Sequence, residues 1–135
     1  MRVASKPAIL VVEDEVLVRL MLADVLDDAG FKVIEAAHAD EALSVLSALP
    51  EVQAVVTDVE MAAGSMDGFA LAHRIRALRP DIGVLIASGR AAPAAGDLPE
   101  HCHFVAKPVH PATLVYLLRS LLGAAGPPTE GAGNA

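Results

Sequence analysis

The chain has 135 residues, which suits a single domain able to bury about two-thirds of its unfolded surface. Its formal charge of −7 argues against direct binding of nucleic acid, which needs a basic face, and no apolar run approaches the roughly 20 residues that span a membrane. Cys102 is the only cysteine and no leader-like segment opens the chain, so we expect a cytoplasmic protein without disulfides.

Short apolar segments bounded by turn residues predict the strands of a buried parallel sheet. Apolar residues make up 54% of the chain but aromatic residues only 3%, so the core must be aliphatic, as in most parallel α/β sheets. In chain order the predicted strands are 8–12, 31–36, 54–58, 82–87 and 102–106.

Helical periodicity fills most of the gaps between these strands. We expect helices over 16–29, from Asp40 to Pro50, from Phe69 to Pro80 and from Pro111 to Leu122. The stretch 90–100 is the exception, because its two prolines and one glycine favour a short or irregular segment over a helix. The pattern predicts an arm at 1–7, an α/β domain at 8–123 and a disordered tail at 124–135.

Chemically active side chains follow four of the predicted strands. Glu13 and Asp14 follow the first, Asp58 ends the third, Ser88 follows the fourth and Lys107 the fifth. Carboxyl ends of parallel strands meet at one edge of a sheet, where two carboxylates about 4 Å apart repel by roughly 4 kcal/mol at an effective dielectric near 20. The arrangement therefore predicts a cation-binding pocket that can accept a phosphoryl group.

In this ordered set of motifs, over roughly 6–123, the chain resembles the receiver domains of two-component response regulators. The resemblance implies a flavodoxin-like, doubly wound sheet of five parallel strands in the order 2-1-3-4-5. It also implies a stand-alone receiver that takes its phosphoryl group from a histidine kinase or phosphotransfer protein and signals through contacts with an unidentified protein. It does not imply an enzyme that turns over a separate substrate.

The resemblance assigns roles to the acidic residues. Asp58 is the phosphoacceptor, and a Mg²⁺ (or Mn²⁺) ion is held by Asp14, Asp58 and the backbone carbonyl of Glu60, with Glu13 acting through water. The alternatives are an Asp58 that only ends its strand and acidic residues that only stabilise the start of a helix.

The remaining site residues are expected either to neutralise the charge of the phosphoryl group or to change conformation when it is present. The resemblance implies that Lys107, before a cis bond to Pro108, stabilises the transferred phosphoryl group. Ser88 would bond a phosphoryl oxygen, and Phe104 would be the aromatic switch, with ordinary packing in the core as its alternative.

The phosphate-side loop departs from the common pattern of the family. Asp67-Gly68 comes nine and ten residues after Asp58, later than in most members, and Ala62 stands where most have proline. Glu60 and Arg90 are opposite charges two residues beyond Asp58 and Ser88, and we hypothesise that they screen attacking water and slow hydrolysis.

Two rival functions and the partner surfaces stay open. A haloacid-dehalogenase-like phosphatase also uses a strand-end Asp with Mg²⁺, although the segment 58–60 follows the third strand and lacks the second Asp; a receiver-shaped scaffold would never be phosphorylated. Apolar Leu17 and Leu20 predict docking of the phosphodonor, and Val115 and Leu122 predict output contacts or a homodimer, with a crowded core as the alternative. No contact with nucleic acid or membrane is expected.

Overall fold

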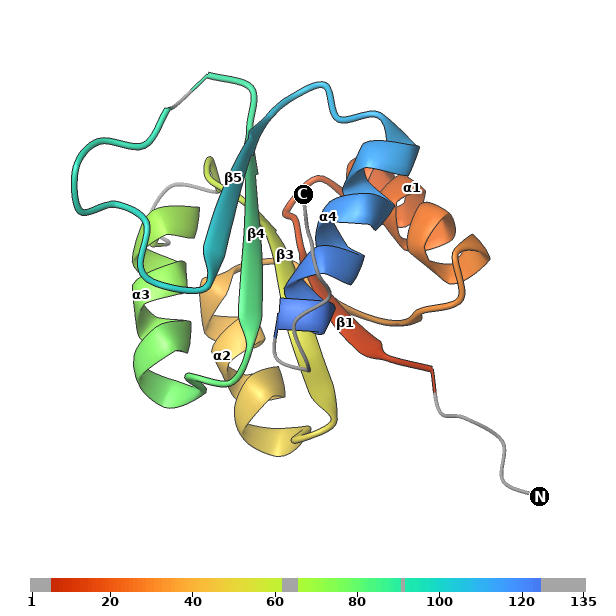
Figure 1. The fold of residues 1–135 in the computed structure, drawn as a ribbon, viewed down its shortest axis with the longest axis horizontal. Helices are drawn as coiled ribbons and strands as arrows, with labels where there is room; N and C mark the ends of the chain where they lie inside the picture. Colours follow the sequence, from red (N-terminus) through yellow and green to blue (C-terminus); the bar gives the residue numbers. More distant parts are fainter. Residues whose placement is uncertain (1–5, 62–65, 91, 125–135) are drawn as a thin grey trace.

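The computed structural model describes residues 6–61, 66–90 and 92–124, and its centre is a parallel sheet in the order β2-β1-β3-β4-β5 (Figure 1). The strands are β1 (Ala8–Val12), β2 (Lys32–Ala36), β3 (Val52–Asp58), β4 (Gly83–Ser88) and β5 (Cys102–Ala106). All four pairs of neighbours are parallel. The predicted flavodoxin-like order is confirmed.

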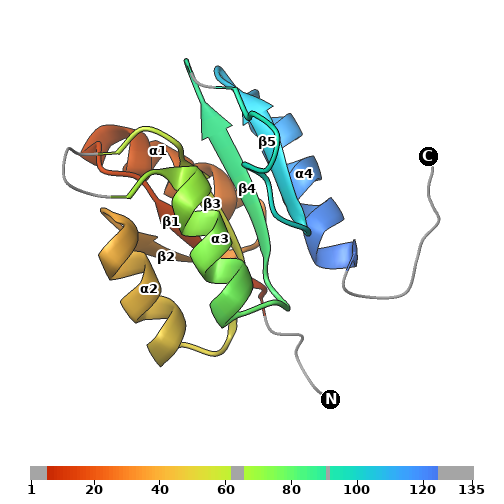
Figure 2. The same ribbon diagram turned by 90° about the vertical axis from the view of Figure 1, so that its left-hand side faces the viewer.

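The helices lie in pairs on the two faces of the sheet, as Figures 1 and 2 show from two sides. They are α1 (Val16–Asp28), α2 (Ala39–Ala48), α3 (Gly68–Leu78) and α4 (Pro111–Ala124). Helices α1 and α4 cover one face and α2 and α3 the other, so successive residues of β1 alternate between two cores. Ile9 belongs to the core that includes Leu118 of α4, and Leu10 to the core that includes Ile75 of α3. Because both faces are covered, β1 is apolar throughout.

Local capping fixes where α2 and α3 begin. The Asp67 side chain accepts a hydrogen bond from the backbone N–H of Ala70 at 2.9 Å and so caps α3. At α2, His38 accepts from the N–H of Glu41, while Glu41 accepts from the N–H of Ala37.

No helix forms between β4 and β5 in the described residues 92–101, which we call the strap. This confirms the prediction made from its prolines and glycine. The strap is nevertheless attached to α3: His73 Nε2 lies 2.9 Å from the carbonyl oxygen of Gly96, and Arg76 forms a 3.0 Å ion pair with Glu100. Leu98 packs against the core on the same side.

Parts of the predicted organisation lie outside the described residues. These are positions 1–5 of the arm, 62–65 in the loop after β3, 91 in the stretch predicted to be irregular, and 125–135 of the predicted tail. Among the helices that the structure describes, none is long and apolar enough to cross a membrane.

Candidate functional site

Four neighbouring strands bring the predicted site residues to one edge of the sheet. One carboxylate oxygen from each of Glu13, Asp14 and Asp58 lies within 4.8 Å of the others. The cluster sits where β1 and β3 leave the sheet toward opposite faces, the usual ligand position in a doubly wound fold. Glu13 and Asp58 are buried, whereas Asp14 is exposed.

Lys107 supplies the positive charge that the cluster requires. Its Nζ lies 3.1 Å from Asp58 Oδ1 and 3.7 Å from Glu13 Oε1. Its backbone N–H donates to the carbonyl oxygen of Ser88 at 2.8 Å, which fixes the end of β5 against β4. The Lys107–Pro108 bond is cis, as the resemblance implied.

The two buried carboxyl groups are held in an unfavourable environment for negative charge. Burial raises the pKa of Asp58; Lys107 opposes this shift and the charge of Glu60 adds to it. Burial also raises the pKa of Glu13, opposed by a hydrogen bond from the Glu15 N–H at 3.1 Å. One ammonium therefore only partly compensates the cluster.

The donor set fits a hard divalent cation. Asp58 Oδ1 is a buried oxygen that faces Lys107 without a properly aligned hydrogen bond. The other atoms nearby that could ligate a metal are carboxylate oxygens of Glu13 and Asp14. Mg²⁺ prefers such oxygen ligands and needs only one or two carboxylates beside its waters. Asp14 and Asp58 are thus suited to ligate it directly.

Arg19 supports the acidic loop and was not found by sequence reasoning. Its guanidinium donates to the backbone carbonyl of Glu13 at 2.8 Å and pairs with Glu35 on β2 at 3.0 Å. It is the only basic residue in α1, a signal that could have drawn attention to it. Arg19 thereby fixes the backbone next to Asp14.

Gly68 lets α3 begin directly against the end of β3. A Cβ atom at this position would overlap the backbone carbonyl oxygen of Asp58. The Gly68 N–H donates to the carbonyl oxygen of Val59 at 3.0 Å, so the two segments are also bonded. The glycine of the displaced Asp67-Gly68 pair is therefore required by packing, wherever the loop places it.

Ser88 reaches the site, but its hydroxyl is bonded to Glu60. Ser88 Oγ donates to Glu60 Oε2 at 2.7 Å and accepts from the Arg90 N–H at 3.2 Å. The sequence indicated each of these residues separately and not their contact. The hypothesis that Glu60 and Arg90 screen attacking water stays a prediction.

Phe104 is half-buried and packs on Phe69 at the start of α3. The ring centroids are 6.2 Å apart with an interplanar angle of 25°. Both rings belong to the core between the sheet and α3, so packing accounts for this position of Phe104. Its role as a switch stays a prediction.

Comparison with known proteins assigns the family. Residues 9–119 match the response regulator receiver domain. The chain belongs to this family. A response regulator receiver protein from Sinorhizobium medicae has a solved structure that superposes with a TM-score of 0.83 at 28% identity, covering 90% of this chain and 98% of that one.

Two curated relatives differ greatly in length. The receiver protein CpdR of Brucella abortus is 33% identical over 87% of this chain and 98% of its own length. The sensor kinase CckA of Brucella abortus is 39% identical over 75% of this chain, but the match spans only 11% of the kinase. Receiver domains of this family are signalling phosphoacceptors and generally bind Mg²⁺ at an acidic pocket, which here corresponds to Glu13, Asp14 and Asp58.

An apolar surface borders the acidic pocket of this receiver domain. A groove of about 550 Å³ runs from Asp58 past Met21 and Val18 of α1 to Pro108. Leu17 and Leu20, which were expected to face a partner, are 73% and 47% exposed. On α4, Val115 and Leu122 are half-buried against the core.

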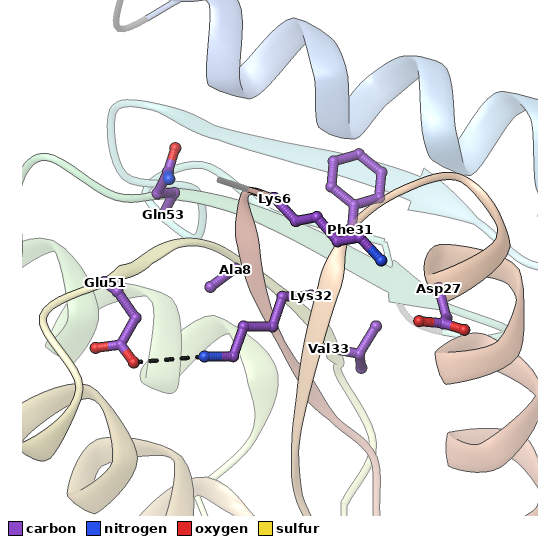
Figure 3. Close-up of a pocket in the computed structure, with 8 residues that line it drawn as sticks. All are labelled: Lys6, Ala8, Asp27, Phe31, Lys32, Val33, Glu51 and Gln53. Carbon is purple, nitrogen blue, oxygen red and sulfur yellow. Dashed lines mark ion pairs between the residues drawn. The ribbon is translucent and has the colours of Figure 1, made fainter. Parts of the chain in front are cut away.

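A second hollow lies at the opposite end of the strands (Figure 3). It measures about 700 Å³ and is lined by residues at the starts of β1 and β2, with Lys32 and Glu51 paired across it at 3.8 Å. Because these charges are remote from Asp58, they offer control positions for experiments on the receiver site.

Proposed function

We propose that the chain is a phosphoacceptor response regulator that receives a phosphoryl group on Asp58 in the presence of Mg²⁺. The observation that carries the proposal is the placement of Asp58 between the Lys107 ammonium at 3.1 Å and the carboxylates of Glu13 and Asp14. This placement gives a buried nucleophile, a fixed positive charge and a set of metal ligands at one point.

In the phosphoryl transfer one bond to phosphorus forms and one breaks. An oxygen of the Asp58 carboxylate forms a bond to phosphorus as the bond from phosphorus to the imidazole nitrogen of a phosphohistidine breaks. The electron pair of the broken bond leaves with the imidazole, which takes a proton from solvent. The product is an acyl phosphate on Asp58.

The chain's own residues position and stabilise this reaction. Lys107 is held so that its ammonium can move from the Asp58 carboxylate to an oxygen of the incoming phosphoryl group. Asp14, Asp58 and the Glu60 carbonyl, with Glu13 acting through water, would hold Mg²⁺, which would supply further positive charge to the phosphoryl oxygens. Ser88 donates to one of those oxygens and Phe104 responds to its movement.

The apolar surface beside the pocket suits a phosphodonor built of helices. Leu17 is 73% exposed and lies on α1, the helix that also lines the groove leading to Asp58. A histidine kinase or phosphotransfer protein that covers α1 would bring its phosphohistidine to this groove. The signal then passes to an unidentified protein, and α4 is the surface we assign to output or to a homodimer.

Phosphorylation by a small donor tests the proposal directly. The purified chain is incubated with labelled acetyl phosphate and Mg²⁺, and we expect one acid-labile label per chain that Asp58→Asn abolishes. Asp24→Asn, which removes an exposed acid from α1, should label like the wild type. Label absent from the wild type would instead support the scaffold, and repeated turnover of a generic phosphatase substrate would support the phosphatase.

A further inference from the structure

The hydroxyl group of Ser88 is already in use before any phosphoryl group arrives. A serine hydroxyl has one proton to donate, and in this structure Ser88 Oγ donates it to Glu60 Oε2 at 2.7 Å. Ser88 is buried, with 2% of its surface exposed, so water does not readily replace this carboxylate as its partner.

We infer that Glu60 is a positioning residue that holds Ser88 away from the phosphoryl site and must release it before Ser88 can bond a phosphoryl oxygen. The inference rests on the proposed function and concerns the regulation of the same site. Glu60 and the phosphoryl group on Asp58 thus compete for one hydroxyl proton.

Backbone hydrogen bonds hold the chain at Val59, next to Glu60, and at Ser88, so the competition concerns mainly the side chains. The Val59 N–H donates to the carbonyl oxygen of Ala87 at 3.0 Å, and the Lys107 N–H donates to that of Ser88 at 2.8 Å. Both the start of the loop that carries Glu60 and the end of β4 are therefore held to neighbouring strands. A change of partner for Ser88 requires its hydroxyl or the Glu60 side chain to rotate.

Electrostatics favours release once Asp58 is phosphorylated. Glu60 stands two residues beyond Asp58 at the carboxyl end of β3 and bonds to Ser88 at the end of the neighbouring strand, so the carboxylates of Glu60 and Asp58 are like charges that repel. Phosphorylation replaces one negative charge by about −1.5 to −2, so repulsion of Glu60 increases. The phosphoryl group therefore both offers Ser88 a new acceptor and weakens the old one.

Release would also reach the segment that follows β4. Ser88 Oγ accepts a hydrogen bond from the N–H of Arg90 at 3.2 Å. A rotation of the Ser88 side chain would change this hydrogen bond, which lies between the end of β4 and the strap. Glu60 thereby links occupancy of Asp58 to the path between β4 and β5.

A double-mutant cycle with a phosphoryl mimic tests the competition. Binding of beryllium fluoride in the presence of Mg²⁺ is measured by titration calorimetry for the wild type, Glu60→Ala, Ser88→Ala and the double variant. Removing the charge of Glu60 should raise affinity for the mimic whether residue 88 is serine or alanine. Competition for the hydroxyl predicts an additional gain that is seen only with Ser88. We expect the gain in affinity from Glu60→Ala to be about fivefold larger with Ser88 present than with Ser88→Ala, as for one hydrogen bond.

Two further variants show whether the hydroxyl itself is responsible. Ser88→Thr keeps a hydroxyl and should restore the excess gain, which a purely structural role of Glu60 would not do. Glu51→Ala removes a carboxylate at the opposite edge of the sheet and should leave affinity within about twofold of the wild type. Melting curves confirm that each variant folds.

The outcomes separate the inference from the proposed function. Equal gains in the two backgrounds, with a wild type that binds the mimic, would overturn the role of Glu60 and leave the phosphoacceptor function standing. A wild type that neither binds the mimic nor takes label from acetyl phosphate would overturn both.

Discussion

The ammonium of Lys107 lies 3.1 Å from the carboxylate of Asp58 and is the cation that contacts the buried acidic cluster in the described chain. Lys107→Met leaves Asp58 and Glu13 without this partner, so in metal-free buffer we expect the free energy of unfolding to fall by about 1–3 kcal/mol, less than for a fully buried pair. Because the cluster is then more negative, Mg²⁺ should stabilise the variant more than the wild type. Urea unfolding with and without Mg²⁺ measures both effects, and an unchanged response to Mg²⁺ would contradict the expectation.

The raised pKa values of Asp58 and Glu13 predict how the metal-free protein responds to pH. Since the folded state binds these protons more tightly than the unfolded state, their contribution to stability is present at low pH and is lost as pH rises through their folded-state pKa values. Asp58→Asn removes one of these groups, so the variant should be the more stable at neutral pH, by on the order of 1 kcal/mol. The gap should close as pH falls, in urea titrations at several pH values with a chelator present. A variant less stable than the wild type at neutral pH would contradict this.

Gly68→Ala is expected to disturb the site through the backbone. The added Cβ would overlap the Asp58 carbonyl oxygen, so α3 or the end of β3 must shift, and we expect a loss of about 1–3 kcal/mol in stability together with slower labelling by acetyl phosphate. Gly123→Ala is the matched control, because a Cβ atom at this position meets nothing within 4 Å. The substitution also replaces a glycine near the end of α4 by a residue that favours helix. It should be neutral or stabilising by up to about 1 kcal/mol.

Arg19→Ala should weaken metal binding without touching a ligand. Loss of the bonds to the Glu13 carbonyl and to Glu35 frees the loop that carries Asp14, so we expect Mg²⁺ affinity to drop by about fivefold, equivalent to about 1 kcal/mol. Calorimetric titration with Mg²⁺ measures this directly. Arg74→Ala removes the same charge from an exposed position on α3 and should bind Mg²⁺ like the wild type.

Loss of label from phosphorylated Asp58 tests the hypothesis that Glu60 and Arg90 screen attacking water. Glu60→Ala and Arg90→Ala should each speed hydrolysis by roughly threefold, which corresponds to less than 1 kcal/mol of barrier. The decay of acid-labile label after removal of acetyl phosphate gives the rate. Hydrolysis at the wild-type rate in both variants would refute the screening role.

Sequence patterns located the strands well wherever an apolar run meets a polar residue. The run that begins β1 and the acidic pair behind it define both the strand and its functional end. Strand β3 begins two residues earlier than expected, because exposed Gln53 interrupts the apolar pattern and shifts the register, while Val52 before it still pairs with Ala8. Where a strand boundary is determined by backbone pairing with the neighbouring strand, the pattern of apolar residues in the sequence does not mark it.

The sequence indicated which residues lie in the site but not which hydrogen bonds they form with one another. The order of motifs indicated Asp14, Asp58 and Lys107 because each lies at or just beyond the carboxyl end of its own strand. The bond from Ser88 to Glu60 depends on the neighbouring positions of β3 and β4 and on side-chain rotation, neither of which local sequence determines. The same holds for Arg19, whose partner is a backbone carbonyl with no residue-specific signature.

The strap between β4 and β5 has a consequence for slow motion within the protein. Its described attachments to α3 are one hydrogen bond to a histidine and one exposed ion pair, each worth about 1 kcal/mol or less, beside the packing of Leu98. Detaching it should therefore require far less free energy than opening the sheet, and its amide protons should exchange with deuterium long before those of β4. In place of a helix, residues 92–101 would then form a connection to β5 that can shift while the sheet stays closed.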